Sequence, residues 1–315
     1  MKRVVVIGGG HGQSIVLRGI KKIPDVHLTA IVTVADDGGS TGRLRREFNI
    51  PAMGDIRGVM TALAEDENIL TELMDYRFED GGVHGEMDGH NLGNIILTAL
   101  TRSSGSFMDA VTKISTVLRV KGDIVPSTTE VITLYAVMED GTIVRGESNI
   151  PRYRNKITRV YYDHEVKATE LAVNAIKEAD YIVFGIGSLY TSILPNLIIT
   201  DIAKAIRESK AEKIYICNSM TQAGETEGYS VEDHVKAIEN VIGENEVGIV
   251  AYACDEIPEE VLENYRKEDA EPVKIRKRYH PYRIDKRELL EFHAGQVRHD
   301  AEKIRAYFEK DVMRQ

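Results

Sequence analysis

Two glycine-rich turns far apart in this 315-residue sequence could bind the phosphates of a ligand. The apolar run Val4–Ile7 breaks into Gly8-Gly9-Gly10-His11-Gly12, and Tyr181–Phe184 breaks into Gly185-Ile186-Gly187-Ser188-Leu189. Glycine lets backbone N–H groups approach an anion closely, and the helix that follows adds positive potential. Two such turns predict a ligand held from both sides, such as a diphosphate or a sugar nucleotide. The candidate contacts are Gly9, Gly10, His11, Gly12, Gly187, Ser188 and Leu189.

The first turn does not have the spacing of a dinucleotide fingerprint. In G-x-G-x-x-G counted from Gly8, the third glycine would fall at Gln13. Asp36 nevertheless follows the second apolar run at about the position of a ribose-binding acid. An NAD-binding oxidoreductase, with NAD as the bound dinucleotide, is therefore an alternative interpretation.

A long glycine-rich polar stretch follows that second apolar run. It contains Asp36 and Asp37, Asp55 comes after it, and arginines lie close in sequence at positions 43, 45, 46 and 57. Carboxylates beside guanidiniums suit either a cation that bridges to phosphate or direct binding of a hydroxylated anion. No metal is expected, although Asp36 and Asp55 could hold magnesium if their side chains converge. His84 and His90 have no partner at i+4 and no cysteine nearby, so zinc is not expected.

Two further polar blocks supply candidate ligand contacts. Asn91 and Asn94 lie at the start of an expected helix, where Asn91 also suits an N-cap. Asn218 and Thr221 follow the apolar run that ends at Cys217. In an open parallel sheet the carboxyl ends of the strands form the ligand edge, so these residues are expected to face the same crevice as the glycine turns.

Strand and helix patterns alternate along the chain, which predicts a Rossmann-like α/β fold with a largely parallel sheet and helices on both faces. A β-rich insert is expected at about 118–162, and a C-terminal segment at about 256–315. One domain spanning 1–315 is the preferred organisation, and two domains divided near the insert are the alternative. Strands are expected at 4–8, 27–34, 181–184, 213–217 and 246–252, and helices at 13–22, 56–64, 69–76, 91–101, 165–178, 197–209, 231–242 and 300–310.

The composition excludes some classes of partner. A net charge of −10 argues against a nucleic acid or an anionic membrane, because neutralising phosphates requires a basic surface. No stretch approaches the roughly 18–20 apolar residues of a membrane span, and the three residues before the first strand are too few for a signal peptide. A cytoplasmic location is expected.

Seven blocks in a fixed order cover nearly the whole chain: Gly8–Gly12, Thr33–Ser40, Gly54–Arg57, Gly89–Asn94, Gly185–Asn196, Asn218–Gln222 and Val297–Asp300. Together they resemble the bacterial gluconeogenesis factor family, which is related in fold to 2-phospho-L-lactate transferase. The resemblance implies a Rossmann-like fold, a cytoplasmic location and a role in cell shape during growth on gluconeogenic carbon sources. It also implies binding of UDP-sugars such as UDP-N-acetylglucosamine, without an established reaction.

This resemblance implies roles for particular residues. The glycine turns would hold the diphosphate, while Asp36, Asn91 and Asn94 would bind ribose or sugar hydroxyls. Arg298 would reach the nucleotide from the C-terminal segment, and Tyr265 is a candidate stacking partner for uracil. No cofactor is required. Cell-wall synthesis or regulatory proteins are candidate partners, and the insert is a candidate interface for a homo-oligomer.

The transferase relatives supply the main alternative. They move a phospholactyl group from a guanylyl diphosphate donor to a deazaflavin alcohol with the help of magnesium. For this chain they imply an enzyme with a nucleotide diphosphate donor, in which Asp36 and Asp55 would hold the metal.

Overall fold

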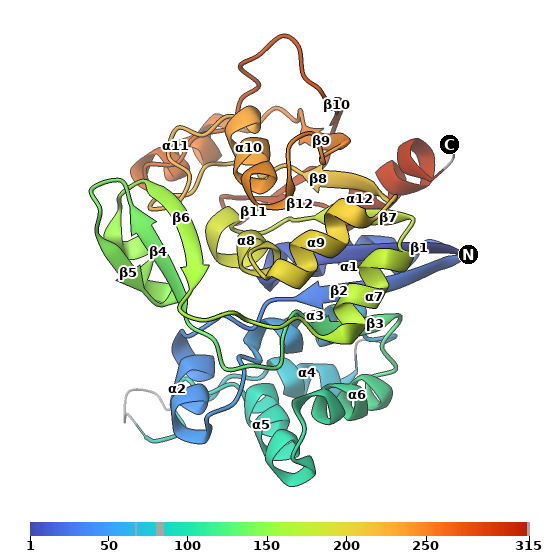
Figure 1. Ribbon diagram of the computed structural model, residues 1–315, viewed down its shortest axis with the longest axis vertical. Helices are drawn as coiled ribbons and strands as arrows, with labels where there is room; N and C mark the ends of the chain where they lie inside the picture. Colours follow the sequence, from blue (N-terminus) through green and yellow to red (C-terminus); the bar gives the residue numbers. More distant parts are fainter. Residues whose placement is uncertain (67, 80–84, 314–315) are drawn as a thin grey trace.

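The centre of the molecule is a parallel β-sheet, seen in a computed structural model that describes residues 1–66, 68–79 and 85–313. In this part of the chain the sheet has seven strands in the order β10-β9-β8-β7-β1-β2-β3 (Figure 1). The predicted Rossmann-like α/β class is confirmed. The strands are β1 (Lys2–Gly8), β2 (Val26–Val32), β3 (Asp123–Pro126), β7 (Tyr181–Phe184), β8 (Glu212–Ile216), β9 (Ile249–Ala253) and β10 (Arg283–Arg287).

The order of the strands reverses between β1 and β7. The chain begins at β1, adds β2 and then β3 on one side, and returns to β7 on the other side before adding β8, β9 and β10. Open α/β sheets bind ligands at such a switch point, outside the carboxyl ends of the strands. The two glycine turns follow β1 and β7, so both lie at this crevice.

The two central strands are buried on both faces. Val4, Val6 and Ile7 of β1 and Val183 of β7 have no exposed surface, which explains why these strands appear as unbroken apolar runs in the sequence. On one side of the sheet, α1 packs on α3 and on α12; on the other, α9 packs on α7 and on α10. The bounds are α1 (Gly10–Ile20), α3 (Gly54–Leu63), α7 (Glu170–Glu178), α9 (Thr200–Glu208), α10 (Val231–Ile242) and α12 (Ala301–Tyr307).

Further helices lie beside the β3 edge of the sheet, in the lower part of Figure 1: α2 (Gly39–Phe48), α4 (Ile69–Asp75), α5 (Leu92–Ser104) and α6 (Phe107–Val117). The sequence analysis expected no helix at α2. The buried Arg45 guanidinium stabilises α2 there, because it donates hydrogen bonds to the carbonyl oxygens of Ala35 (3.2 Å) and Asp36 (2.7 Å). Tertiary contacts thus compensate for a weakly helical sequence.

The β-rich insert forms a separate antiparallel sheet of β4 (Leu134–Met138), β5 (Ile143–Arg145) and β6 (Ile157–Tyr162), with β4 in the centre. A short connection between Met138 and Ile143 joins β4 to β5 in an antiparallel hairpin. β3 falls inside the range expected for the insert, but it pairs in parallel with β2 as an edge strand of the main sheet.

The C-terminal segment contains more regular structure than its charged sequence indicates. It holds α11 (Glu259–Lys267), β10, and an antiparallel hairpin of β11 (Leu290–His293) and β12 (Gln296–His299). The final helix begins at Ala301, where the Asp300 carboxylate accepts a hydrogen bond from the Lys303 amide (2.7 Å) as its N-cap. Among the described helices, none combines the length and the apolar character needed to cross a membrane.

Candidate ligand-binding site

A cleft of about 690 Å³ opens at the switch point of the sheet. Nine predicted ligand contacts line it: Gly9, Gly10, His11, Gly12, Asp36, Gly187, Ser188, Asn218 and Arg298. Asp55, predicted as a metal ligand of a transferase, lines it as well. The structure adds residues that the sequence analysis did not select: Ile15, Arg18, Glu147, Ile186, Thr191, Ser192, Gln222, Val297 and His299. The cleft therefore draws on segments from the whole length of the chain.

The two glycine turns are in direct contact. A Cβ atom at Gly12 would lie 2.5 Å from the carbonyl oxygen of Ile186, so only glycine allows the start of α1 to approach the turn after β7. A Cβ at Gly9 would lie 2.5 Å from Oδ2 of Asp55. Gly10 adopts φ +65°, a left-handed conformation that glycine tolerates best. These glycines are needed for close backbone approach.

The loop after β8 holds the second turn in place. The side-chain amide of Asn218 donates to the carbonyl oxygen of Gly187 (2.9 Å), and that of Gln222 donates to Oγ of Ser188 (2.9 Å). The buried Glu225 carboxylate accepts a hydrogen bond from the Tyr190 amide (3.2 Å), just beyond the turn. Asn218, which was predicted as a ligand contact, therefore also positions Gly187.

Three acidic side chains line the cleft, and each has a raised pKa. Burial, together with the nearby charge of Asp36, raises the pKa of Asp55 to about 7. Burial raises the pKa of Glu147 to about 8, with added repulsion from Asp36 and Asp55. The pKa of Asp36 also lies above its usual value because of burial. Near neutral pH, protonated carboxyl groups can donate hydrogen bonds to ligand oxygens and repel an anionic ligand less than carboxylates would.

Positive charge comes from two arginines on different elements. Arg18 lies on α1 and, within the described part of the chain, makes no hydrogen bond or ion pair. Arg298 lies on β12, where the only hydrogen bond of its guanidinium among described residues goes to Oε1 of Gln296 (2.9 Å). Burial lowers the pKa of the neighbouring His299 to about 4, so this imidazole is neutral at pH 7. Neither guanidinium is paired with a carboxylate among the described residues, so both are suited to bind a phosphate.

Six predicted contacts lie outside the lining of this cleft: Asp37, Asn91, Asn94, Leu189, Thr221 and Tyr265. Oδ1 of Asp37 accepts a hydrogen bond from the Ser148 amide (2.9 Å) and thereby ties the insert to the loop after β2. The Tyr265 hydroxyl accepts a hydrogen bond from the Val297 amide (3.0 Å), which fixes the hairpin that contains Arg298. The hydroxyl of Thr221 accepts from the backbone of a neighbouring loop (2.9 Å). Asp37, Thr221 and Tyr265 thus stabilise segments next to the cleft and do not line it.

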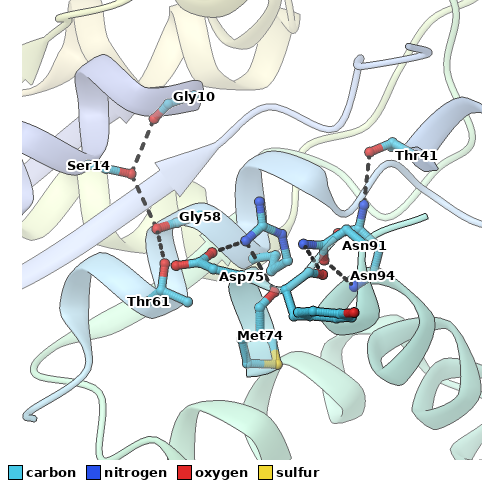
Figure 2. Close-up of polar contacts among 11 residues, drawn as sticks. Gly10, Ser14, Thr41, Gly58, Thr61, Met74, Asp75, Asn91 and Asn94 are labelled. Atoms are coloured by element: carbon cyan, nitrogen blue, oxygen red, sulfur yellow. Dashed lines mark hydrogen bonds and ion pairs between the residues drawn. The ribbon is translucent and has the colours of Figure 1, made fainter. Parts of the chain in front are cut away.

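Asn91 and Asn94 line a second cavity of about 520 Å³ (Figure 2). This cavity shares Gly10, His11, Arg18, Asp36 and Asp55 with the first. Oδ1 of Asn91 accepts from the Asn94 amide (3.0 Å), and its Nδ2 donates to the carbonyl oxygen of Tyr76 (3.1 Å). Asn91 is therefore the N-cap of α5, and both ends of its side-chain amide are engaged.

The described residues contain no group of three or more His, Cys, Asp or Glu side chains placed to hold a metal ion. Asp36 and Asp55 line the same two cavities, so a pair of carboxyl groups is available to a cation that also binds ligand phosphates. His84, considered above for zinc, lies outside the described residues. His90 is buried, and its Nδ1 lies 3.2 Å from Oγ of Ser40.

Several known proteins are similar to this chain in sequence and in fold. The model of the family "2-phospho-L-lactate transferase CofD" matches residues 4–290. A gluconeogenesis factor from Halalkalibacterium halodurans is 48% identical over 273 residues, which cover 86% of this chain and 84% of that protein. A putative gluconeogenesis factor from Thermotoga maritima is 43% identical over 317 residues, 98% of each chain. A crystal structure of a UPF0052 family member from Bacillus halodurans has a TM-score of 0.92 at 44% identity, covering 97% of this chain and 99% of that one.

Proposed function

Because this chain belongs to the CofD family, with relatives named gluconeogenesis factor, we propose that it is a regulatory protein that binds a UDP-sugar such as UDP-N-acetylglucosamine. It binds this ligand in the cleft at the switch point without converting it chemically. It acts in cell shape during growth on gluconeogenic carbon sources, through a cytoplasmic partner in cell-wall synthesis or its regulation. The contact between the two glycine turns at the ends of β1 and β7 is the observation that supports the proposal most directly.

The diphosphate lies between the two turns. Backbone amides of Gly9–Gly12 meet it from the side of α1, and those of Gly187 and Ser188 meet it from the side of β7. Arg298 neutralises part of its charge from the rim of the cleft. The cleft volume of about 690 Å³ lies within the range of roughly 300–1,000 Å³ that is usual for pockets that hold small molecules.

The carboxyl groups of Asp36 and Asp55 bind ribose or sugar hydroxyls. Both lie in the cleft wall next to the first glycine turn. A carboxyl group whose pKa is near 7 can accept from a hydroxyl when ionised or donate to an ester oxygen when protonated. The same property explains how an acidic cleft can accommodate a diphosphate without a bound cation.

A transferase activity is the second candidate, because the matching family model carries the name of a transferase. In that case Asp36 and Asp55 would hold a magnesium ion on the donor diphosphate, and the ion would neutralise the leaving phosphate. The chain's own glycine turns would orient the donor in the same way for either function.

A thermal and calorimetric comparison distinguishes the two. UDP-N-acetylglucosamine at a hundredfold excess over its Kd should raise the free energy of unfolding by about 2.7 kcal/mol. GDP with a deazaflavin alcohol and magnesium should produce no comparable shift. Mass spectrometry after incubation should recover the sugar nucleotide intact, and its conversion would contradict the non-enzymatic function.

A further inference from the structure

The second cavity contains a buried amide oxygen without a partner. Asn94 is only 3% exposed and lines this cavity from α5. Its Nδ2 donates to Oγ1 of Thr41 (3.4 Å, Figure 2), whereas its Oδ1 has no hydrogen-bond partner among the described residues. Leaving a buried acceptor unpaired is costly, so a donor from a ligand is the expected complement.

Guanidinium groups line the same cavity. Arg57 is largely buried and forms an ion pair with Asp75, yet its Nε has no partner among the described residues. Arg77 is exposed at the cavity, and one of its guanidinium nitrogens donates a hydrogen bond to the carbonyl oxygen of Gly89 (2.8 Å). Arg18 lies in the wall that the two cavities share. Since Asp75 already pairs with Arg57, the guanidiniums of Arg18 and Arg77 are the ones that favour a ligand with a phosphate or a carboxylate.

The remaining lining is hydroxylated. Ser14, Thr41 and Thr61 contribute side-chain hydroxyls (Figure 2), and the described lining contains no Phe, Tyr or Trp. Apart from the His11 imidazole, a flat aromatic ligand would therefore find no ring in this lining on which to stack. Hydroxyl groups on a ligand would find both donors and acceptors. The lining is complementary to a polyhydroxylated molecule.

Size and charge indicate an occupant separate from the nucleotide. The two cavities measure about 520 and 690 Å³, and each is large enough for a ligand of its own. The neutral sugar of a UDP-sugar would not need Arg57 and Arg77. We propose that the second cavity binds a polyhydroxylated anion of the sugar phosphate class, at the same time as the switch-point cleft binds its nucleotide. Asp36 and Asp55, present in both walls, couple the two ligands.

The test uses glucose 6-phosphate as the probe, titrated calorimetrically into the full chain with and without saturating UDP-N-acetylglucosamine. We expect one binding site in both titrations and no binding of neutral glucose. Arg77→Gln should weaken the probe by about threefold to tenfold, the loss of one charge-assisted contact at an exposed position. Asn94→Leu should weaken it at least tenfold, since it removes the buried amide. Arg77→Gln should not change affinity for UDP-N-acetylglucosamine more than about twofold, apart from the coupling, because Arg77 does not line the switch-point cleft.

Two matched variants serve as controls. Thr101→Val replaces a buried polar residue on the same helix, away from the cavity, and Arg278→Gln removes an exposed arginine elsewhere; both should bind the probe normally. If Asn94→Leu does not fold, Arg77→Gln decides alone. Competition between the probe and UDP-N-acetylglucosamine, equal binding of inorganic phosphate and sugar phosphate, or no binding at millimolar concentration would overturn the proposal. Binding that depends on Arg77 without any binding of UDP-N-acetylglucosamine would support it while contradicting the proposed function.

Discussion

At the scale of single residues, the carboxyl group of Asp55 is expected to contribute to the pH dependence of stability, as are other buried carboxyl groups such as Glu147. Its pKa is about 7 in the folded protein and close to the usual 3.8 in the unfolded chain, so the folded state binds more protons between these values. The free energy of unfolding should therefore fall as the pH rises from about 4 to about 7. Asp55→Asn should reduce this fall by on the order of 1 kcal/mol, because contact with water in the cleft lessens the effect of burial.

The measurement is urea unfolding at pH 5, 6, 7 and 8. Asp109→Asn, which changes an exposed aspartate on α6, is the control and should leave the pH dependence as it is. An identical slope in the Asp55→Asn protein would show that this carboxyl titrates normally.

Arg298 is the residue whose loss should affect nucleotide binding most directly. Replacement by Ala should weaken UDP-N-acetylglucosamine by about 1.5–3 kcal/mol, or roughly tenfold to a hundredfold in Kd, as for a charge-assisted hydrogen bond. Stability should change by less than about 1 kcal/mol, because the Arg298 guanidinium donates a hydrogen bond only to the Gln296 side chain among the described residues. Isothermal calorimetry on this variant and on Arg278→Ala measures the difference. Equal affinities of the Arg298→Ala and Arg278→Ala proteins for UDP-N-acetylglucosamine would show that Arg298 does not contact the ligand.

At the scale of elements, the contact between the start of α1 and the turn after β7 depends on Gly12. Gly12→Ala would place a Cβ 2.5 Å from backbone atoms that cannot move aside as a side chain could. We expect a loss of about 1–3 kcal/mol in the free energy of unfolding and weaker nucleotide binding, because the two turns are forced apart. Gly58→Ala on α3 is the matched control, since its nearest neighbour would be Oγ of Ser14 at 3.9 Å. That helical site should be neutral or gain up to about 1 kcal/mol, and equal losses at both positions would contradict the argument.

The elements that sequence patterns identified are those buried on both faces or along one stripe. β1 and β7 were predicted because apolar runs between glycines have few other interpretations. α2, β10 and β12 were not, because polar and charged residues dominate their sequences. Arg283–Arg287 in particular forms an edge strand, where its charged side chains protect the sheet from pairing with other chains. Their structure depends on the neighbours that they pack against.

At the scale of the whole molecule, ligand binding is expected to be independent of a divalent cation. The backbone amides of two turns, Arg18 and Arg298 can neutralise a diphosphate, while protonated Asp55 and Glu147 reduce the repulsion. The Kd for UDP-N-acetylglucosamine should therefore change less than about threefold in excess EDTA. Calorimetry in EDTA, then after addition of magnesium, tests this. Loss of affinity that magnesium restores would favour the transferase instead.

The sequence by itself determined the class of fold and the glycine turns, since each depends on residues close together in the chain. It also determined the family, since seven short blocks occur in a fixed order. It also identified Arg298 from a family resemblance, but not the hairpin that presents it. Only the tertiary structure decided which distant segments meet. Glu147 reaches the cleft from the insert, and Asn94 lies in a second cavity, because the order of strands and the docking of the insert bring them there. Contacts of this kind join residues that lie far apart in the chain. The local sequence of either segment does not indicate which distant segment it will pack against.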